Sequence, residues 1–198
     1  MDEETTELFH AMIKRCLNQE VAPYYDNWEA AGEIPRSLWH ALGDAGLLGI
    51  DLDEKHGGAG ADIAITQLAL EEMSRQGFGG LASAYNIHAN IVMPYIQNLG
   101  SPAQQAQWLP AMARGETLAA IAMTEPHAGS DLASMKTRAK RTTNGWEISG
   151  SKTFITNGQF ADLVIVCAKT DPSAGAKGVS LFLVDTHLAG FSRGKPIQ

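Results

Sequence analysis

The 198-residue chain has a composition that excludes several classes of protein. Hydrophobic residues make up 44% and charged residues 19%, as in ordinary soluble globular proteins. The formal net charge of −7 argues against a nucleic-acid partner, because no basic field is available to bind phosphates. The two cysteines, Cys16 and Cys167, form no disulfide framework, so we expect a reducing compartment. The acidic N-terminus resembles no targeting signal and no apolar run could cross a membrane, which together indicate a cytoplasmic protein.

The first 115 residues show the spacing of three and four residues between apolar side chains that is typical of α-helices. Several helix ends carry recognisable signals. Pro35 can occupy a first helical position, and Asp62 and Ser101 can each cap a helix. Gly46 can end the helix that begins at Pro35. The sequence therefore predicts helices at about 6–22, 35–45, 63–75, 81–99 and 102–112.

The helix expected over residues 81–99 has an apolar face that continues for about five turns. We expect Pro94 to kink this helix. His88 lies on the apolar face, where a buried histidine with a hydrogen-bond partner is a more common outcome than a group lining a substrate cavity. The face consists of Leu81, Ala84, Tyr85, His88, Ile91, Val92, Tyr95 and Leu99.

From Leu118 onward the apolar spacing changes to two residues, which is typical of β-strands. Asn144-Gly145 stands between two alternating runs and predicts a hairpin with a type I′ turn. Strands are expected near residues 118–124, 135–142, 146–149, 152–156, 163–169 and 179–184.

The two periodicities predict an α+β protein of two domains. Residues 1–116 would form an N-terminal all-helical bundle domain. Residues 117–198 would form an incomplete antiparallel β-barrel or sandwich domain, because six short strands leave an edge that a complete domain would pair. We therefore expect the chain to be truncated within the β domain.

Two segments of the β half, residues 121–131 and 153–158, carry the groups that a flavin nucleotide requires. Thr124 and Thr156 supply hydroxyls for the polar atoms of the ring system, and Phe154 supplies a flat face for packing. The small residues at the end of the first segment can turn the backbone so that successive N–H groups face a phosphate. Each feature alone is more often a plain strand or turn, but the ordered pair favours a flavin site.

Other cofactor and catalytic sites lack their signatures. The chain has no P-loop motif, and Gly58-Ala-Gly60 lacks the third glycine of the dinucleotide fingerprint, with Ile63 in its place. The six histidines lack the spacing of a metal site, so no metal is expected. Ser130 has no neighbouring base in the sequence, and Glu71-Glu72 is more typical of a helix surface than of an acid–base pair.

Three segments resemble the signature segments of acyl-CoA dehydrogenases, and the likeness extends from the first expected helix to the last expected strand. The chain is most similar to the long-chain branch of that family. This likeness rests on Phe154, where the family often has tryptophan, on Ile87-His88 and on the run Val179-Ser-Leu-Phe-Leu-Val184. The three segments are Met123-Thr-Glu-Pro-His-Ala-Gly-Ser-Asp131, Ile148-Ser-Gly-Ser-Lys152 and Phe154-Ile-Thr-Asn-Gly158.

The resemblance implies an FAD-dependent enzyme that desaturates acyl-CoA thioesters between the α and β carbons in fatty-acid β-oxidation. It implies substrate contacts for Ser130, Ala176 and Lys177. His127 stands where the family commonly has glycine, and a positive φ there would strain the backbone by ~1 kcal/mol or more. The residues that it implies for FAD contact are Ile121, Met123, Thr124, Gly129, Ser130, Phe154, Ile155 and Thr156.

In that family a glutamate of a third, helical domain removes the α-proton while the β-hydride passes to the flavin. The resemblance therefore implies no catalytic residue in this chain, which we expect to be inactive alone. It also implies electron-transfer flavoprotein as a partner and a homotetramer for the complete enzyme. Two alternatives stay open: a non-catalytic truncated module or part of a split protein, and a flavin oxidase or monooxygenase on the same fold.

Overall fold

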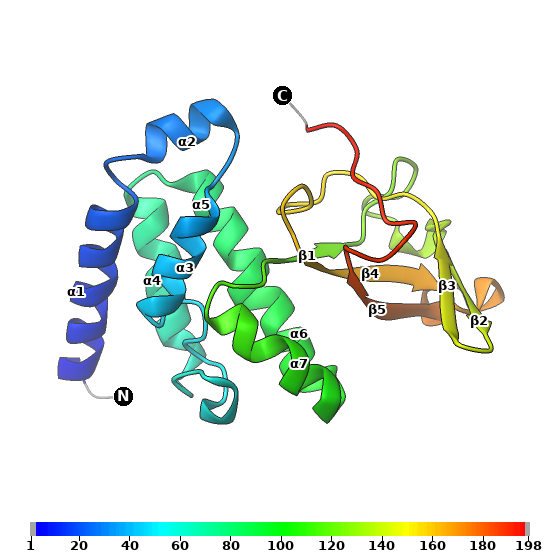
Figure 1. The fold of residues 1–198 in the computed structure, drawn as a ribbon, viewed down its shortest axis with the longest axis horizontal. Helices are drawn as coiled ribbons and strands as arrows, with labels where there is room; N and C mark the ends of the chain where they lie inside the picture. Colours follow the sequence, from blue (N-terminus) through cyan, green and yellow to red (C-terminus); the bar gives the residue numbers. More distant parts are fainter. Residues whose placement is uncertain (1–2, 197–198) are drawn as a thin grey trace. The chain divides into compact units, whose positions relative to one another are not determined.

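The computed structural model describes residues 3–196, which form two compact units. One unit is helical and ends at Leu118, and the other begins at Ala119 and contains a β-sheet (Figure 1). The α+β class is therefore confirmed. Within the described range, no helix combines the length and the apolar character that crossing a membrane requires.

The helical unit contains seven α-helices, a 3₁₀ turn and a π-helical segment among the described residues. Their bounds are α1 (Glu3–Glu20), α2 (Tyr25–Ala31), α3 (Arg36–Asp44), η1 (Glu54–His56), α4 (Ile63–Arg75), α5 (Gly79–Tyr85), η2 (Asn86–Val92), α6 (Met93–Leu99) and α7 (Pro102–Ala113).

The predicted N-caps of α4 and α7 are confirmed. The Asp62 carboxylate accepts a 2.8 Å hydrogen bond from the Ala64 N–H, and Ser101 forms a reciprocal capping box with Gln104. Pro35 precedes its helix as the N-cap, one position earlier than predicted. The short helix α2 was not predicted, because no side chain caps its N-terminus.

The predicted apolar face of residues 81–99 is correct up to Val92 and wrong beyond it. The Met93 N–H bonds to the His88 carbonyl five residues earlier, which is the spacing of a π-helix. Each such turn contains one residue more than an α-turn, so the residues after η2 are rotated about the helix axis. Tyr95 and Leu99 consequently face solvent, with 39% and 71% exposure. Met93 and Ile96 are buried instead.

The core of the helical unit surrounds Trp39 and Tyr85, which are both fully buried. The Tyr85 hydroxyl donates a 2.7 Å hydrogen bond to the Leu47 carbonyl. His88 contacts the edge of the Trp39 ring, and its Nε2 lies 3.2 Å from the Met112 carbonyl oxygen. His88 is therefore a core histidine with a hydrogen-bond partner, as predicted.

Two adjacent glutamates of α4 lie in opposite environments. Glu71 is exposed, as predicted for a helix surface. Glu72 is only 2% exposed, so the prediction of a surface pair is wrong for this residue.

The β unit contains five strands and two 3₁₀ segments among the described residues. Their bounds are β1 (Ala119–Ala122), η3 (Leu132–Ser134), β2 (Arg138–Thr142), β3 (Gly145–Ser149), β4 (Leu163–Lys169), η4 (Pro172–Gly178) and β5 (Val179–Asp185).

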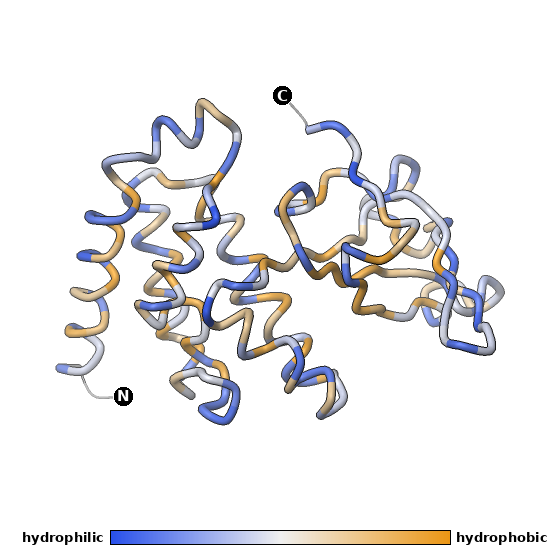
Figure 2. Tube along the Cα trace, in the orientation of Figure 1, coloured by the Kyte–Doolittle hydropathy of each residue, from blue (hydrophilic) through white to orange (hydrophobic). Residues whose placement is uncertain are grey.

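The sheet is mixed and centres on β4. Strand β5 runs antiparallel along the whole of β4, and β2 and β3 form an antiparallel hairpin. Strand β1 pairs in parallel with β4 at 163–166, and β2 joins β4 in parallel at Lys169. The expected antiparallel pairing thus holds for the hairpin and for β5, whereas β1 and β2 each pair with β4 in parallel. Figure 2 shows β4 as a nearly continuous hydrophobic strand, in agreement with its burial.

Two local predictions for the β half are wrong. Residues 152–156 form no strand; they lead into a turn in which Phe154 has a φ of 56°. The hairpin forms, but Thr142 pairs with Gly145, so Thr143 and Asn144 are the two loop residues. Neither has the positive φ that a type I′ turn requires.

Candidate functional site

The two segments singled out in the sequence lie side by side at the end of β1. The Thr153 N–H donates a 2.9 Å hydrogen bond to the Thr124 carbonyl oxygen, and the Lys152 ammonium donates one of 3.0 Å to the Met123 carbonyl oxygen. Segments separated by nearly thirty positions are therefore joined at two successive residues. The juxtaposition that a shared ligand would need is present.

Strand β1 positions the first segment. All four of its residues are buried, because β1 pairs with the buried strand β4. Ile121 belongs to this strand and is only 8% exposed, so its side chain is buried. Exposure begins immediately after the strand, with Met123 at 36% and Thr124 half-buried. The exposed part of the first segment therefore starts at Met123.

A tight turn follows. Glu125 and Ala128 exchange two backbone hydrogen bonds, of 2.9 and 3.1 Å, which place Pro126 and His127 at its tip. His127 does not have a positive φ, so the condition under which we expected backbone strain is not met. A histidine is accommodated here because the turn does not require the conformation that favours glycine.

The residues after this turn expose backbone donors. Gly129, Ser130 and Asp131 are all exposed, and their N–H groups form no hydrogen bond within residues 3–196. A Cβ added at Gly129 would contact no other atom within 4 Å. Three successive free donors in an open turn can bind an anionic oxygen.

The second segment presents an aromatic ring on a constrained backbone. Phe154 is 72% exposed, and its φ of 56° is rare for a residue other than glycine. The next residue, Ile155, packs on the buried cluster beneath, and Thr156 is exposed. Asn157 also has a positive φ, of 65°, and its amide nitrogen lies 3.2 Å from the Ala119 carbonyl oxygen. The turn thus has an anchored base and an exposed tip.

The two threonines at this place keep free hydroxyls. Neither the Thr124 nor the Thr156 hydroxyl forms a hydrogen bond within the part of the chain that the structure describes. Together with the exposed Phe154 ring and the N–H groups that follow Ala128, they give the two joined segments free hydrogen-bonding groups and an aromatic face. This set fits a planar, polar ring system that carries a phosphate.

A buried ion pair lies between the two segments and was not foreseen from the sequence. The Lys152 ammonium is 2.9 Å from a Glu125 carboxylate oxygen, and the side chains are 10% and 4% exposed. Burial by itself would raise the Glu125 pKa, but hydrogen bonds from Thr137, Lys136 and Lys152 lower it to about 2. A glutamate only three positions after an all-apolar strand was the signal that could have revealed it, because buried charges are usually paired.

The residues predicted to contact a substrate come from two parts of the β unit. Ala176 and Lys177 are exposed on η4, and η4 packs beside η3, the 3₁₀ segment that directly follows Asp131. Ser130 lies on the exposed turn described above. Among the described residues, no group of three or more His, Cys, Asp and Glu side chains is arranged to hold a metal ion.

Comparison with known proteins gives consistent matches. Residues 3–116 match the family model for the acyl-CoA dehydrogenase N-terminal domain, and residues 120–198 match that for the acyl-CoA dehydrogenase middle domain. The chain is 46% identical over 194 residues to the mitochondrial long-chain specific acyl-CoA dehydrogenase of Rattus norvegicus, covering 97% of this chain and 45% of the relative.

Solved structures give the same result. An acyl-CoA dehydrogenase from Geobacillus kaustophilus superposes with a TM-score of 0.95 at 42% identity, covering 100% of this chain and 52% of that one. A glutaryl-CoA dehydrogenase from Mycobacterium smegmatis in complex with FADH2 superposes with a TM-score of 0.88 at 31% identity, covering 97% and 48%. The chain spans about half the length of the proteins that it matches.

Proposed function

Because the chain belongs to the acyl-CoA dehydrogenase family, we propose that its β unit forms part of the FAD site of an enzyme that desaturates acyl-CoA thioesters in fatty-acid β-oxidation. The observation that carries the proposal is the 2.9 Å hydrogen bond between the Thr153 N–H and the Thr124 carbonyl. It brings together the two segments whose hydroxyls, N–H groups and exposed ring suit a flavin nucleotide.

Each part of the site would have its own role toward FAD. Thr124 and Thr156 would donate hydrogen bonds to polar atoms of the ring, and Phe154 would pack against the ring face. The N–H groups of Gly129 and Ser130 would bind a phosphate oxygen. Met123 and Ile155 would complete the contacts through their backbone, and Ile121 would support them from inside the strand. Bound FAD would supply the hydride acceptor of the reaction.

The same surface would receive the substrate. Ser130 would contact the acyl-CoA thioester arm, and the exposed Ala176 and Lys177 would lie near the CoA moiety. A lysine ammonium suits the phosphates of CoA as a point charge. FAD and substrate would then lie against neighbouring parts of one turn, as hydride transfer between them requires.

The remaining features of the enzyme are proposals that concern the longer protein. We assign the role of general base to no residue of this chain, and we propose that the 198 residues alone show no dehydrogenase turnover. Proton abstraction typically contributes about 10²–10⁴-fold to a rate, so the groups present cannot replace it. The complete enzyme would be a cytoplasmic homotetramer that passes electrons to electron-transfer flavoprotein.

Two experiments test this function. Titration of the ¹⁵N-labelled chain with FAD, followed by NMR, should shift the amide signals of residues 123–131 and 153–157, even where the affinity is weak. A T124A/T156V double variant should bind FAD at least about tenfold more weakly, as loss of two hydrogen bonds implies. T143A, in the exposed hairpin loop, is the matched control and should bind like the parent chain.

The second experiment is a dye-reduction assay with saturated acyl-CoAs. The chain alone should give no turnover. Sustained dye reduction would contradict the assignment of the base to a part of the enzyme outside these residues, and FAD-induced shifts confined to the helical unit would contradict the site.

A further inference from the structure

The Glu125 carboxylate is a junction of three chain segments. It accepts hydrogen bonds of 2.6 Å from the Lys136 N–H and 2.9 Å from the Thr137 N–H, just before β2. It also accepts one of 2.9 Å from the Lys152 ammonium. Of these three donors, only the ammonium comes from the segment that leads to Phe154.

Lys152 reaches the first segment at two points. Besides the Glu125 carboxylate, its ammonium bonds to the Met123 carbonyl at 3.0 Å. Both acceptors flank Thr124, and the neighbouring Thr153 N–H bonds to Thr124 itself. Three successive residues of the first segment are therefore held by two successive residues of the second.

The contact between Lys152 and Glu125 is an ion pair that is almost fully shielded from solvent. The two side chains are 10% and 4% exposed, and the lowered pKa of Glu125 keeps the carboxylate ionised through the physiological range. Two backbone N–H groups already bind the carboxylate, so holding the loop to β2 does not require a lysine. What the lysine adds is the connection between the segments. Removing one partner of such a pair leaves an uncompensated buried charge, which favours separation of the parts it joined.

We infer that Lys152, through its contacts with Glu125 and Met123, is a positioning residue that sets the spacing between the Thr124 and Thr156 sides of the cofactor site. The inference rests on the proposed function for the identity of the ligand, and on the contacts above for the positioning. Lys152 would not contact the flavin: its ammonium is already engaged with protein oxygens and is nearly buried.

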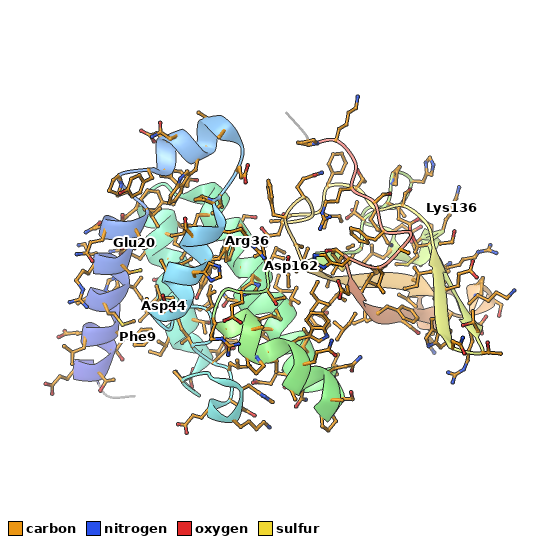
Figure 3. All side chains as sticks on the ribbon, in the orientation of Figure 1. Phe9, Glu20, Arg36, Asp44, Lys136 and Asp162 are labelled. Atoms are coloured by element: carbon orange, nitrogen blue, oxygen red, sulfur yellow. The ribbon has the colours of Figure 1, made fainter. Side chains whose placement is uncertain are left out.

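The test compares K152M with K152R and with K136M. Methionine keeps much of the apolar stem and removes the charge, and arginine keeps the charge. Lys136 is the matched control because its side chain is exposed (Figure 3). The hydrogen bond that it donates to Glu125 comes from its backbone N–H. The two readouts are the exchange rate of the Thr153 amide hydrogen, divided by that of a β4 amide such as Val164, and the FAD affinity from NMR titration.

In K152M the exchange ratio should rise at least about tenfold, because the segment opens locally while β4 reports on global unfolding. FAD affinity should fall at least about tenfold, since a mispositioned site loses several contacts together. K152R should recover most of both values, and K136M should match the parent chain.

The outcomes distinguish the positioning role of Lys152 from the proposed FAD site. An unchanged exchange ratio in K152M overturns the inference, whatever happens to FAD. A raised ratio in a chain that shows no FAD shifts in any variant supports the positioning role and counts against the proposed cofactor. Where K152M does not fold, E125Q takes its place: it keeps the acceptor oxygen but removes the charge, and an unchanged exchange ratio there overturns the inference equally.

Discussion

His10 Nε2 lies 3.1 Å from Glu72 Oε2, which joins α1 to α4 across 62 positions of the chain. The carboxylate is 2% exposed and also accepts a 2.8 Å hydrogen bond from the Gln76 side chain. The Gln76 hydrogen bond lowers the Glu72 pKa most strongly; burial opposes it, and His10 and Arg75 lower the pKa further. A buried acid is thus kept ionised inside a helix contact.

The substitution E72Q should lower the free energy of unfolding at pH 7 by about 1–3 kcal/mol, as expected when a buried, hydrogen-bonded charge is lost. The effect should depend on pH in a defined direction. Because folding lowers this pKa, the stabilisation is present above the unfolded value of about 4.3 and is lost as the pH falls through the folded value. Urea denaturation of both proteins from pH 7 to pH 3 should therefore show the difference shrinking in acid. E71Q, on the exposed side of α4, should show no comparable loss at any pH.

The positive φ of Phe154 predicts that removing its side chain will not lower the stability of the chain but will weaken FAD binding. A non-glycine residue at positive φ costs about 1–3 kcal/mol, and glycine avoids that cost while adding about 0.5–1 kcal/mol of chain entropy. Since the ring is 72% exposed, little burial is lost on its removal. F154G should therefore equal or exceed the parent chain in free energy of unfolding, while its FAD-induced NMR shifts weaken. F154V should lower the stability, because a β-branched residue tolerates this φ poorly; the reverse order would show that the side chain stabilises the turn.

Gly150 is predicted to tolerate no side chain. A Cβ at this position would lie 2.8 Å from the Thr137 Cα and closer still to the Thr137 hydroxyl. G150A should lower the free energy of unfolding by about 1–3 kcal/mol, the usual cost of overpacking. The thermal midpoint of G194A serves as the comparison, because a Cβ there meets no atom within 4 Å. Equal midpoints for the two variants would mean that β2 and the end of β3 separate readily.

The buried Tyr85 of the helical core and the exposed Tyr95 allow a matched pair of substitutions. Y85F removes the hydroxyl that donates to the Leu47 carbonyl and leaves that acceptor unpaired, so the free energy of unfolding should fall by about 1–3 kcal/mol. Y95F deletes the same atom from a side chain that is 39% exposed, where water can replace the partner, and should change stability little. Burial and the nearby Asp51 charge raise the Tyr85 pKa. Its near-ultraviolet absorbance should accordingly remain that of a neutral phenol at about pH 10, where a tyrosine in water ionises.

Local sequence signals were sufficient to predict much of the helical unit. Asp62 and Ser101 cap their helices as predicted, because a cap depends on residues only two or three positions away. The buried state of Glu72 could not be predicted in this way, since His10 approaches it from 62 positions away. The strand expected at 152–156 does not form for a related reason. Contacts with Thr124 and Ala119, more than 25 positions away, hold the backbone in a turn.

The candidate site, like the fold, could be predicted from the sequence only in part. Spacing and residue type were enough to single out Thr124, Phe154 and Thr156, and the structure places their two segments side by side. The pattern could not show that Ile121 is buried, or that the segments are joined by Glu125 and Lys152, which are 27 positions apart. Such pairings depend on the register of β1 against β4, which alternating hydrophobicity does not specify.

The wider turn of η2 affects how this chain should be aligned with its relatives. A protein whose corresponding helix is α-helical throughout would match residues 79–99 only with a one-residue gap near Asn86–Val92. Without that gap, solvent-facing Tyr95 and Leu99 would be equated with interior positions of the relative. Deleting a single residue inside η2 should accordingly be better tolerated than inserting one, because deletion restores the ordinary helical count and leaves the buried face of α6 unchanged.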